Sequence, residues 1–310
     1  MMHKNLATVL GTAALLGASL SAHAWTVDFE SDINGNTMVH GQVLNIEQAS
    51  GFPDWSASAP TTGPYATGTP GNPIGPAMEI RAYNNTSGST TSEFAVVFDS
   101  REHPTRDSDL ESPFEGPFKV YTYDNQTMAQ HDGGVLADAQ TAAQLQMPGN
   151  IAIVQENFQS GGSDLARFPG CYDGICTHPD DEFASGSNTI GQIIFEFDSP
   201  ATLFSIDVFD IEDGSEQAAR IDFWDEDGFF ACVHFPETGD NGAARLVFNG
   251  GAGYENVVKA KVTFNGSGAI DNLVGDSPTG GGGDPQVSAP GTLALVALSL
   301  FGLRMRRRRG

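Results

Sequence analysis

Residues 190–209 read IGQIIFEFDSPATLFSIDVF, and this stretch indicates the fold class. Its β-branched and aromatic residues gather in Ile190–Phe197 and Thr202–Phe209, which predicts two strands. Similar runs, separated by clusters of Gly, Pro, Asn, Asp and Ser, recur through residues 25–274. The other predicted strands are Trp25–Glu30, Gln42–Ile46, Ala77–Ala82, Phe94–Phe98, Asn150–Gln155, Ala219–Trp224, Phe229–Phe235, Ala244–Phe248, Val257–Phe264 and Ala269–Val274. So many strands predict an all-β fold, an antiparallel β-sandwich in which each sheet buries one face.

Beyond the strands, the sequence predicts one hairpin and one helix. Apolar and polar residues alternate in Ile221–Phe229, and Asp227-Gly228 tolerates the positive φ of a hairpin turn. The segment Asp225–Gly228 is also similar to a calcium loop, but it lacks the EF-hand spacing and the closing Glu, which favours the hairpin. Apolar residues recur at helical spacing in Val135–Met147, and Pro148 ends this run.

The first 24 residues have the pattern of a secretory signal peptide. A basic start precedes the apolar stretch Leu6–Leu20, and Ser21–Ala24 has the small-x-small form of a signal-peptidase site. The alternative, a buried first helix of a cytosolic domain, requires a polar face that Ala13–Leu20 does not offer. We therefore expect export through the Sec machinery, cleavage by signal peptidase and a mature chain that begins at Trp25.

Charge and length restrict the partners of the mature chain. Residues 25–274 suffice for one large β domain or two small ones. The sequence has 15 basic and 39 acidic residues. Loss of Lys4 and of the five arginines between Arg304 and Arg309 leaves nine basic residues and a net charge of −30. Such a surface repels nucleic acid and anionic lipid and attracts cations, which argues against DNA binding. Solubility alone is the simpler explanation of the acid excess.

The three cysteines are expected to serve structure. Cys171 and Cys176 flank a segment that contains Gly174, which can turn the chain, so we expect a disulfide that closes a small loop. An oxidising compartment allows this bond to persist. Cys232 lies in an apolar run, which favours a buried residue over a nucleophile. A metal site built from thiols is less favoured because no CxxC pair is present.

The C-terminal segment has three parts. A linker, residues 275–288, reads GDSPTGGGGDPQVS and is expected to be flexible. In residues 289–310, the apolar run Leu293–Leu303 barely crosses a hydrocarbon core of ~30 Å. The adjacent arginines hold the C-terminus in the cytoplasm, which leaves the preceding chain outside. The alternative, an amphipathic helix on a membrane surface, requires a polar stripe that Leu293–Leu303 lacks. The basic cluster consists of Arg304, Arg306, Arg307, Arg308 and Arg309.

This layout strongly resembles the PEP-CTERM tail, which joins a short Pro-containing motif, an apolar span and terminal arginines. The motif consists of Val287, Ser288, Ala289 and Pro290, where the usual one is Val-Pro-Glu-Pro. The resemblance implies that an exosortase-like membrane enzyme cuts the tail after a transient stay in the inner membrane. The ectodomain would then reach the cell surface or an exopolysaccharide matrix of a Gram-negative bacterium.

Blocks spread through residues 25–274 resemble a recurring domain of such proteins, for which no activity is settled. Among them are Val27–Glu30, Asp107–Pro113 and Gly266–Asp271. The opening Phe29-Glu30 and the closing Ala269–Asp271 are also similar to MAM and carbohydrate-binding jelly rolls. That resemblance implies a jelly-roll-like sandwich whose first and last strands lie side by side and share a calcium ion.

The candidate ligand-binding residues are carboxylates and aromatic side chains. Calcium takes six to eight oxygen ligands, several of them anionic. Paired end strands would supply Glu30 and Asp271, although acidic loops usually serve only as solvated surface. Further candidates by residue type are Asp32, Asp107 and Asp109 for calcium, and Trp55, Tyr65 and Tyr172 for glycans. Each aromatic residue can equally cover the core.

Motifs of common enzymes do not occur in the chain. The sequence contains no GxSxG, no HExxH and no phosphate loop. A glycosidase needs only two carboxylates at the right separation, which leaves that class open. We therefore predict an exported structural or adhesive protein with calcium-supported glycan binding. A secreted carbohydrate-active enzyme, a hydrolase or lyase, is the alternative.

Overall fold

The stretch Ile190–Phe209 forms β10, one strand of 20 residues, where the sequence predicts two. The first half of β10 pairs with β2 (Met78–Thr86) on one side and β14 (Tyr254–Phe264) on the other. Its second half pairs with β13 (Gly242–Val247) and β15 (Ala269–Asp276). The prediction of two strands was therefore wrong in number but right in composition. One strand connects two groups of neighbours.

The neighbours of β10 change at an irregular segment. Its ladder with β14 shifts register between Glu196 and Leu203, and Pro200 lies in this interval. Proline has no N–H to donate to a ladder, and sheets tolerate it at such irregular positions. The strand therefore continues through the Asp-Ser-Pro-Ala segment although its partners change there.

The computed structural model describes residues 24–31, 36–44, 78–86, 89–92, 95–105, 107–124, 134–155, 171–172, 175–176, 179, 190–211, 219–264 and 266–276. These residues belong to one compact unit, His23–Pro285. The remaining elements are β1 (Ala24–Val27), β3 (Ser89–Ser92), β4 (Ala95–Asp99), β5 (Glu115–Thr122), β6 (Val135–Leu136), α2 (Ala139–Gln146), β7 (Asn150–Val154), β8 (Cys171–Tyr172), β9 (Ile175–Cys176), β11 (Arg220–Asp225), β12 (Gly228–His234) and η3 (Asn249–Gly251).

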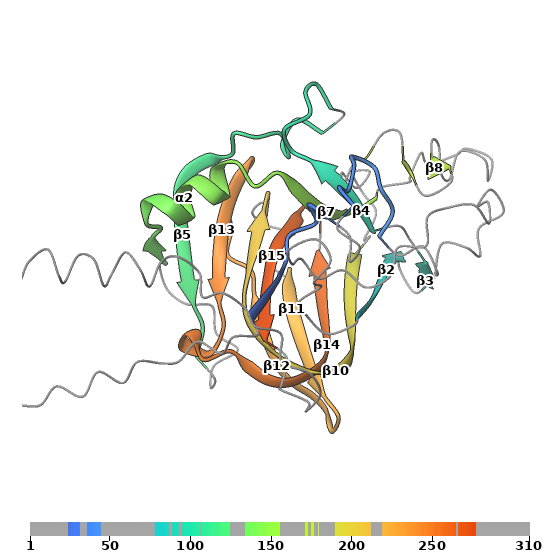
Figure 1. Ribbon diagram of the computed structural model, residues 1–310, viewed down its shortest axis with the longest axis vertical. Helices are drawn as coiled ribbons and strands as arrows, with labels where there is room; N and C mark the ends of the chain where they lie inside the picture. The colour runs from blue at the N-terminus through green and yellow to red at the C-terminus, as the bar shows by residue number, and fades with distance from the viewer. Residues whose placement is uncertain are drawn as a thin grey trace, which may run out of the picture. The chain divides into compact units, whose positions relative to one another are not determined.

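The described strands confirm the all-β prediction and join into one curled sheet (Figure 1). The main path runs β12–β11–β14–β10–β13–β5–β6, and β8 pairs with β9 separately. Branches add β2 with β3 beside β10, and β1 and β7 with β4 beside β15. The described strands pair in antiparallel ladders, with one exception: β13 and β5 pair in parallel. The prediction of a purely antiparallel fold was therefore wrong for this pair.

The two end strands of the described chain lie side by side. β1 pairs antiparallel with β15, from Ala24 opposite Asp276 to Val27 opposite Leu273. The strand also takes in Gly275 and Asp276, which the sequence places in the linker. Glycine is required at 275, because an added Cβ would lie 2.4 Å from Cζ2 of Trp25. The expected first residue of the mature chain is therefore packed into the core beside the last strand.

Alternating residues of these strands form the main core. Phe195, Leu203 and Val208 of β10 pack with Phe223 of β11 and with Trp25, all almost fully buried. Burial of each such side chain contributes about 1.5–3 kcal/mol. The strand period of two therefore gives the sheet one face in the core and leaves the other available for polar side chains.

Three local predictions can be compared with the structure. Asp225 Oδ1 accepts hydrogen bonds from the N–H groups of Asp227 and Gly228 at 2.9 and 3.0 Å, which confirms the hairpin turn. The predicted helix begins only at Ala139, because Val135 and Leu136 pair with β5 instead. The strand predicted at Gln42–Ile46 is wrong within its described part, which forms isolated bridges.

Candidate functional site

Two buried aspartates face each other at the centre of the sheet. Asp207 of β10 lies opposite Asp271 of β15, and the two residues are 0% and 1% exposed. Arg245 of β13, the partner of Asp207 on its other side, donates hydrogen bonds of 2.7 and 2.8 Å to that carboxylate. The Asn272 amide donates to Asp207 Oδ2 at 3.0 Å and to Asp271 Oδ2 at 2.8 Å. One guanidinium therefore faces two carboxylates.

The second carboxylate, Asp271, has an excess of negative charge around it. Its Oδ1 is buried and accepts no hydrogen bond from the described part of the chain. Burial raises the pKa of Asp271 well above its ordinary value, and the charges of Asp207, Asp28 and Glu30 raise that pKa further. Burial also raises the pKa of Asp207, although the hydrogen bonds of Arg245 oppose this effect. The site therefore favours either a proton or a bound cation.

A break in the β1–β15 ladder brings residues 28–30 into this environment. The ladder ends at Val27 and Leu273, and Phe29 and Asn272 adopt positive φ values of 53° and 48° just beyond it. Such values are uncommon for residues with a side chain, so the chain bends at this point on both strands. Asp28 Oδ1 accepts the N–H of Glu30 at 3.1 Å and stabilises the bend.

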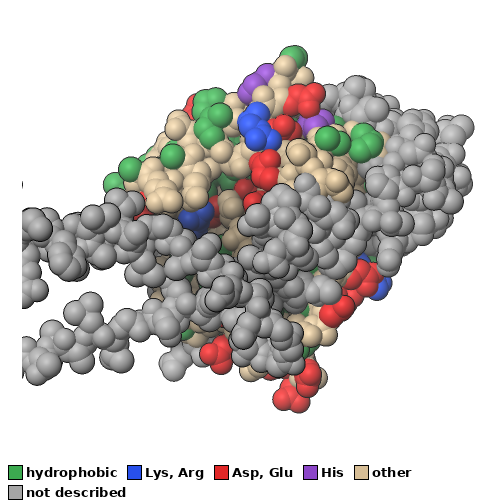
Figure 2. Space-filling model, viewed as in Figure 1, with side chains coloured by type: hydrophobic (Ala, Val, Ile, Leu, Met, Phe, Trp, Pro, Cys, Tyr) green, Lys and Arg blue, Asp and Glu red, His purple; other side chains and the backbone are tan. Residues whose placement is uncertain are grey.

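The Glu30 carboxylate is held by groups from β7 and from the loop after β4. Its Oε1 accepts the Asn150 N–H at 2.9 Å, and its Oε2 lies 3.3 Å from Nη2 of Arg101. Arg101 also contacts Asp99 at 2.7 Å. Figure 2 shows acidic, basic and histidine side chains gathered over the part of the sheet where β4 and β7 lie in Figure 1. The side chains of Glu30 and Arg101 are 37% and 47% exposed, so their ion pair is a surface contact.

The predicted calcium ligands fall into two sets. Glu30 acts electrostatically on Asp271, and the role of these two residues as calcium ligands stays a prediction. Asp107 and Asp109 lie together in the loop after β4, where burial and the charges of Asp240 and Asp107 raise the pKa of Asp109. Among the described residues, no group of three His, Cys, Asp or Glu side chains is arranged to hold a metal ion. Any ion at Asp271 would therefore require Glu30 or Asp28 to move.

Several predicted residues cannot be placed. The side chain of Tyr172 is outside the described atoms, although its backbone belongs to β8. No helix within the described ranges is long and apolar enough to cross a membrane. The signal peptide, Asp32, Trp55, Tyr65, Val287–Pro290 and Arg304–Arg309 all lie outside the described residues.

The described cysteines occupy the positions that a structural role requires. In the β8–β9 hairpin, Cys171 lies directly opposite Cys176, which is buried. Cys232 is a free thiol, 8% exposed, and confirms the prediction of a buried residue. Burial raises the pKa of Cys232, and the charge of Asp222 adds to this effect. A raised pKa disfavours the thiolate that a nucleophile needs.

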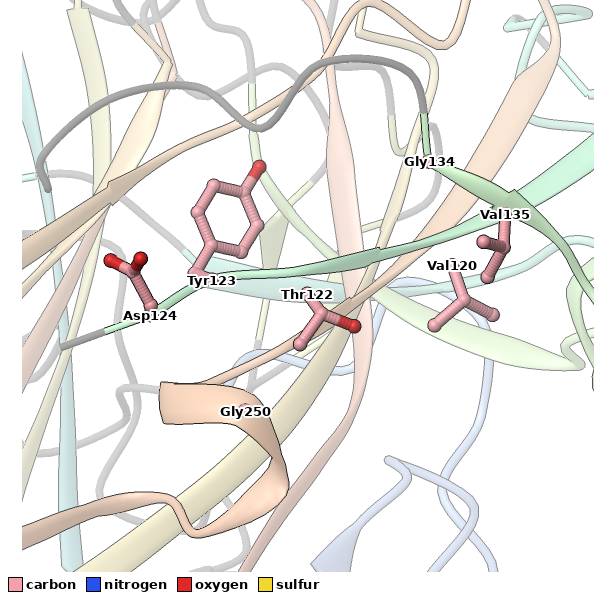
Figure 3. Close-up of a pocket in the computed structure, with 7 residues that line it drawn as sticks. All are labelled: Val120, Thr122, Tyr123, Asp124, Gly134, Val135 and Gly250. Atoms are coloured by element: carbon pink, nitrogen blue, oxygen red, sulfur yellow. The ribbon is translucent and has the colours of Figure 1, made fainter.

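A hollow of about 260 Å³ lies where β5 and β6 approach η3 (Figure 3). Thr122 and Tyr123 point to opposite sides of the strand there, and Asp124 is the acidic residue of the described lining. The Tyr123 hydroxyl donates a 2.7 Å hydrogen bond to the carbonyl of His234. Burial raises the pKa of Tyr123, which keeps the phenol neutral. The described lining therefore offers a single carboxylate and a neutral phenol.

Sequence reasoning did not select Asp28, Asp207 or Arg245 as site residues. The available signal was Asp207 itself, a charged residue within the apolar run of β10. Buried charges are rare unless paired, so such a position indicates a partner on a neighbouring strand. Comparison of the chain with protein-family models, curated proteins and solved structures finds no match.

Proposed function

We propose that this chain is an exported cell-surface or extracellular-matrix protein of a Gram-negative bacterium with a structural or adhesive role. In this proposal, calcium supports a jelly-roll-like β-sandwich ectodomain that binds glycans. The proposal is supported chiefly by one observation, the buried Asp271 oxygen that accepts no hydrogen bond from the described chain. The acid excess of the sequence, 39 acidic against 15 basic residues, also favours a cation as ligand.

Calcium suits this site because the Arg245 guanidinium forms hydrogen bonds with only one of the two buried carboxylates. Arg245 directs both of its short hydrogen bonds to Asp207. A buried charge without a partner is costly, so Asp271 must bind a proton or a cation. Extracellular calcium modules bind with dissociation constants of about 10⁻⁴–10⁻³ M, and Asp271 with Glu30 and Asp28 would supply anionic oxygens of the preferred type.

The ion pair between Glu30 and Arg101 permits this rearrangement at little cost. Both side chains are more than a third exposed, and their shortest N–O distance is 3.3 Å. Exposed pairs of this kind contribute about 0–1 kcal/mol. Arg101 would keep its 2.7 Å contact with Asp99 after Glu30 turned away. The Oε2 atom of Glu30 can therefore exchange a guanidinium for a calcium ion without loss of a large stabilising interaction, provided that Oε1 keeps its hydrogen bond from the Asn150 N–H.

Thermal melting of the full chain with calcium and with EDTA tests the proposal. Calcium at 100 times its dissociation constant adds about 2.7 kcal/mol, which raises Tm by roughly 5–10 °C in a domain of this size. Asp271→Asn and Glu30→Gln should remove this increase, whereas Asp227→Asn, a change in the exposed hairpin turn, should keep it. A Tm that is the same in calcium and in EDTA rejects the calcium site.

Processing is tested separately by mass spectrometry of the protein recovered from the producing cells. We expect a chain that starts at Trp25 and ends before Leu293, because both ends have the patterns of removable segments. An uncut polypeptide inside the cell would contradict export.

The hairpin of β8 and β9 supports the further proposal of a Cys171–Cys176 disulfide. The two residues are direct cross-strand partners. Alkylation with and without prior reduction measures the bond, and two thiols that react without reduction would disprove it. Cys232, which is buried and free, serves as the internal reference.

A further inference from the structure

One face of the sheet formed by β2, β10, β14, β11 and β12 points away from the core. Ile221 and Phe223 of β11 and Ala260 and Val262 of β14 pack in the core cluster. Alternate residues of a strand point to opposite faces, so their neighbours point outward. On β11 and β14 the residues of this other face pair as Trp224 with Lys259, Asp222 with Lys261 and Arg220 with Thr263. Asp222 and Thr263 are buried, so the exposed part of the face lies around the remaining residues.

An aromatic pair and two lysines form one end of this outer face. Trp224 and Phe229 are cross-strand partners whose ring centroids lie 5.7 Å apart in an edge-to-face arrangement. Phe229 is 48% exposed, unusual for a large apolar side chain in this protein. The ammonium groups of Lys259 and Lys261 lie 4.3 and 5.3 Å from the centroid of the Trp224 ring. Apolar ring surface and positive charge therefore adjoin.

The same face carries several of the few basic residues of this acidic chain. Cross-strand pairs of β10 with β14 and β2 place Glu196, Glu79 and Arg81 on it. The cross-strand pairs of this face include four cations and three acids, in a chain whose mature form is expected to carry −30. The cations are Arg81, Arg220, Lys259 and Lys261, and the acids are Glu79, Glu196 and Asp222.

Not every basic side chain of this face forms an ion pair with an acidic side chain. Arg220 and Lys261 share Asp222, at 2.8 and 3.3 Å. Arg81 contacts Glu79 and Glu196, at 2.9 and 3.1 Å. Lys259 forms no ion pair with any described residue, although the chain as a whole has 39 acidic and 15 basic residues. Its ammonium group is therefore available to an external anion.

We propose that this outer face binds an acidic polysaccharide, a polymer whose sugar rings carry carboxylate groups. This inference rests on the proposed adhesive function and specifies its ligand class. The C–H face of a sugar ring would pack on Trp224 and Phe229, and a ring carboxylate would pair with Lys259 and Lys261. Charges are screened over about 8 Å in physiological salt, so the lysines dominate locally while the acidic remainder repels the polymer elsewhere.

The acidic hairpin turn limits the direction of the bound polymer. Asp225, Glu226 and Asp227 follow Trp224, and acidic side chains occupy the end of the molecule where the β11–β12 hairpin projects (Figures 1 and 2). An anionic chain would be repelled along that hairpin. It would instead cross the strands from β12 towards β2, past Lys259 and Lys261 on β14 to Arg81 on β2.

Binding of the full chain to polygalacturonate, with dextran as the neutral polymer, tests the inference in EDTA. EDTA removes divalent bridges between carboxylates, so only direct contacts remain. We expect wild-type protein to bind polygalacturonate, with affinity about tenfold weaker in Trp224→Ala and in Lys259→Gln. The matched control is Lys119→Gln on β5, which should bind as wild type. Glu226→Gln should bind more tightly, because it removes a repulsive charge and no ion pair among the described residues. Melting temperatures establish that each variant is folded.

The outcomes separate this inference from the function on which it rests. Binding to dextran but not to polygalacturonate would keep the adhesive function and overturn the acidic ligand class. Polygalacturonate binding that is unaffected by Trp224→Ala and Lys259→Gln would place the site elsewhere and overturn the inference. Equal, lysine-dependent binding to DNA or to phosphatidylglycerol vesicles would overturn it too, because the face would then be a general anion surface. Failure on both polymers and on a broad glycan panel, in calcium as well as in EDTA, would reject the glycan-binding function itself.

Discussion

Replacement of Arg245 by Met should strongly destabilise the protein, because it leaves the buried Asp207 carboxylate without its cation. Arg245 makes two hydrogen bonds of 2.7 and 2.8 Å to Asp207, whose side chain is 1% exposed. Removal of one partner of a buried ion pair costs about 3–5 kcal/mol. In a domain of roughly 250 residues this lowers Tm by roughly 10 °C. Urea denaturation at pH 7 in EDTA measures the free energy of unfolding directly.

The double variant Arg245→Met/Asp207→Asn tests the cause of this loss. It removes the unpaired charge at Asp207, so it should recover most of the stability lost in Arg245→Met. Arg220→Met is the matched control, because Asp222 keeps its 3.3 Å contact with Lys261; it should cost no more than about 1 kcal/mol. The reasoning is refuted if Arg245→Met unfolds within about 1 kcal/mol of wild type, or if the double variant is no more stable than the single one.

Three further predictions follow from named contacts. The raised pKa of Asp271 favours its protonated form in the folded protein. Wild type in EDTA should therefore lose stability as the pH rises from about 4 through the folded-state pKa of Asp271. Asp271→Asn should flatten this part of a plot of Tm against pH, and an unchanged slope would contradict the assignment. At Gly149, φ is +90° and an added Cβ would lie 2.0 Å from Glu30 Oε1. The added methyl group should displace this oxygen from the Asn150 N–H, which donates to it at 2.9 Å. Gly149→Ala should therefore cost about 1–3 kcal/mol more in urea melts than Gly250→Ala, where the added Cβ has no neighbour within 4 Å; equal costs would exclude the contact. Asp225→Ala removes two hydrogen bonds of the hairpin turn, at 2.9 and 3.0 Å, and should lower the free energy of unfolding by about 1 kcal/mol. A variant that melts at the wild-type temperature would show that the turn does not depend on this side chain.

The elements that sequence reasoning missed have weak local signals. β5 contains Pro117, and its first three residues are exposed, so Glu115–Thr122 has neither a clean alternation nor an uninterrupted apolar run. It becomes a strand because β13 offers it a parallel partner. The same holds at Val135-Leu136, where helical spacing in sequence gives way to pairing with β5. In both cases a partner distant in sequence outweighs local preference.

The candidate site shows the same division. The paired end strands were expected from the resemblance of the chain ends, and Glu30 and Asp271 do interact electrostatically. Arg245 and Asp207 lie 38 residues apart, and no spacing rule links them. Their contact depends on the register of β10 with β13. The aromatic and basic outer face likewise depends on the register of β11 with β14.

The sequence alone determined the all-β class, the apolar runs that became strands and the turn at Asp227-Gly228, because each depends on residues within one short segment. Only the tertiary structure decided that Ile190–Phe209 is a single strand and which charged residues meet across it. The physical reason is that register is fixed when the whole sheet buries one face, and a shift of one residue would turn every side chain of a strand to the opposite side.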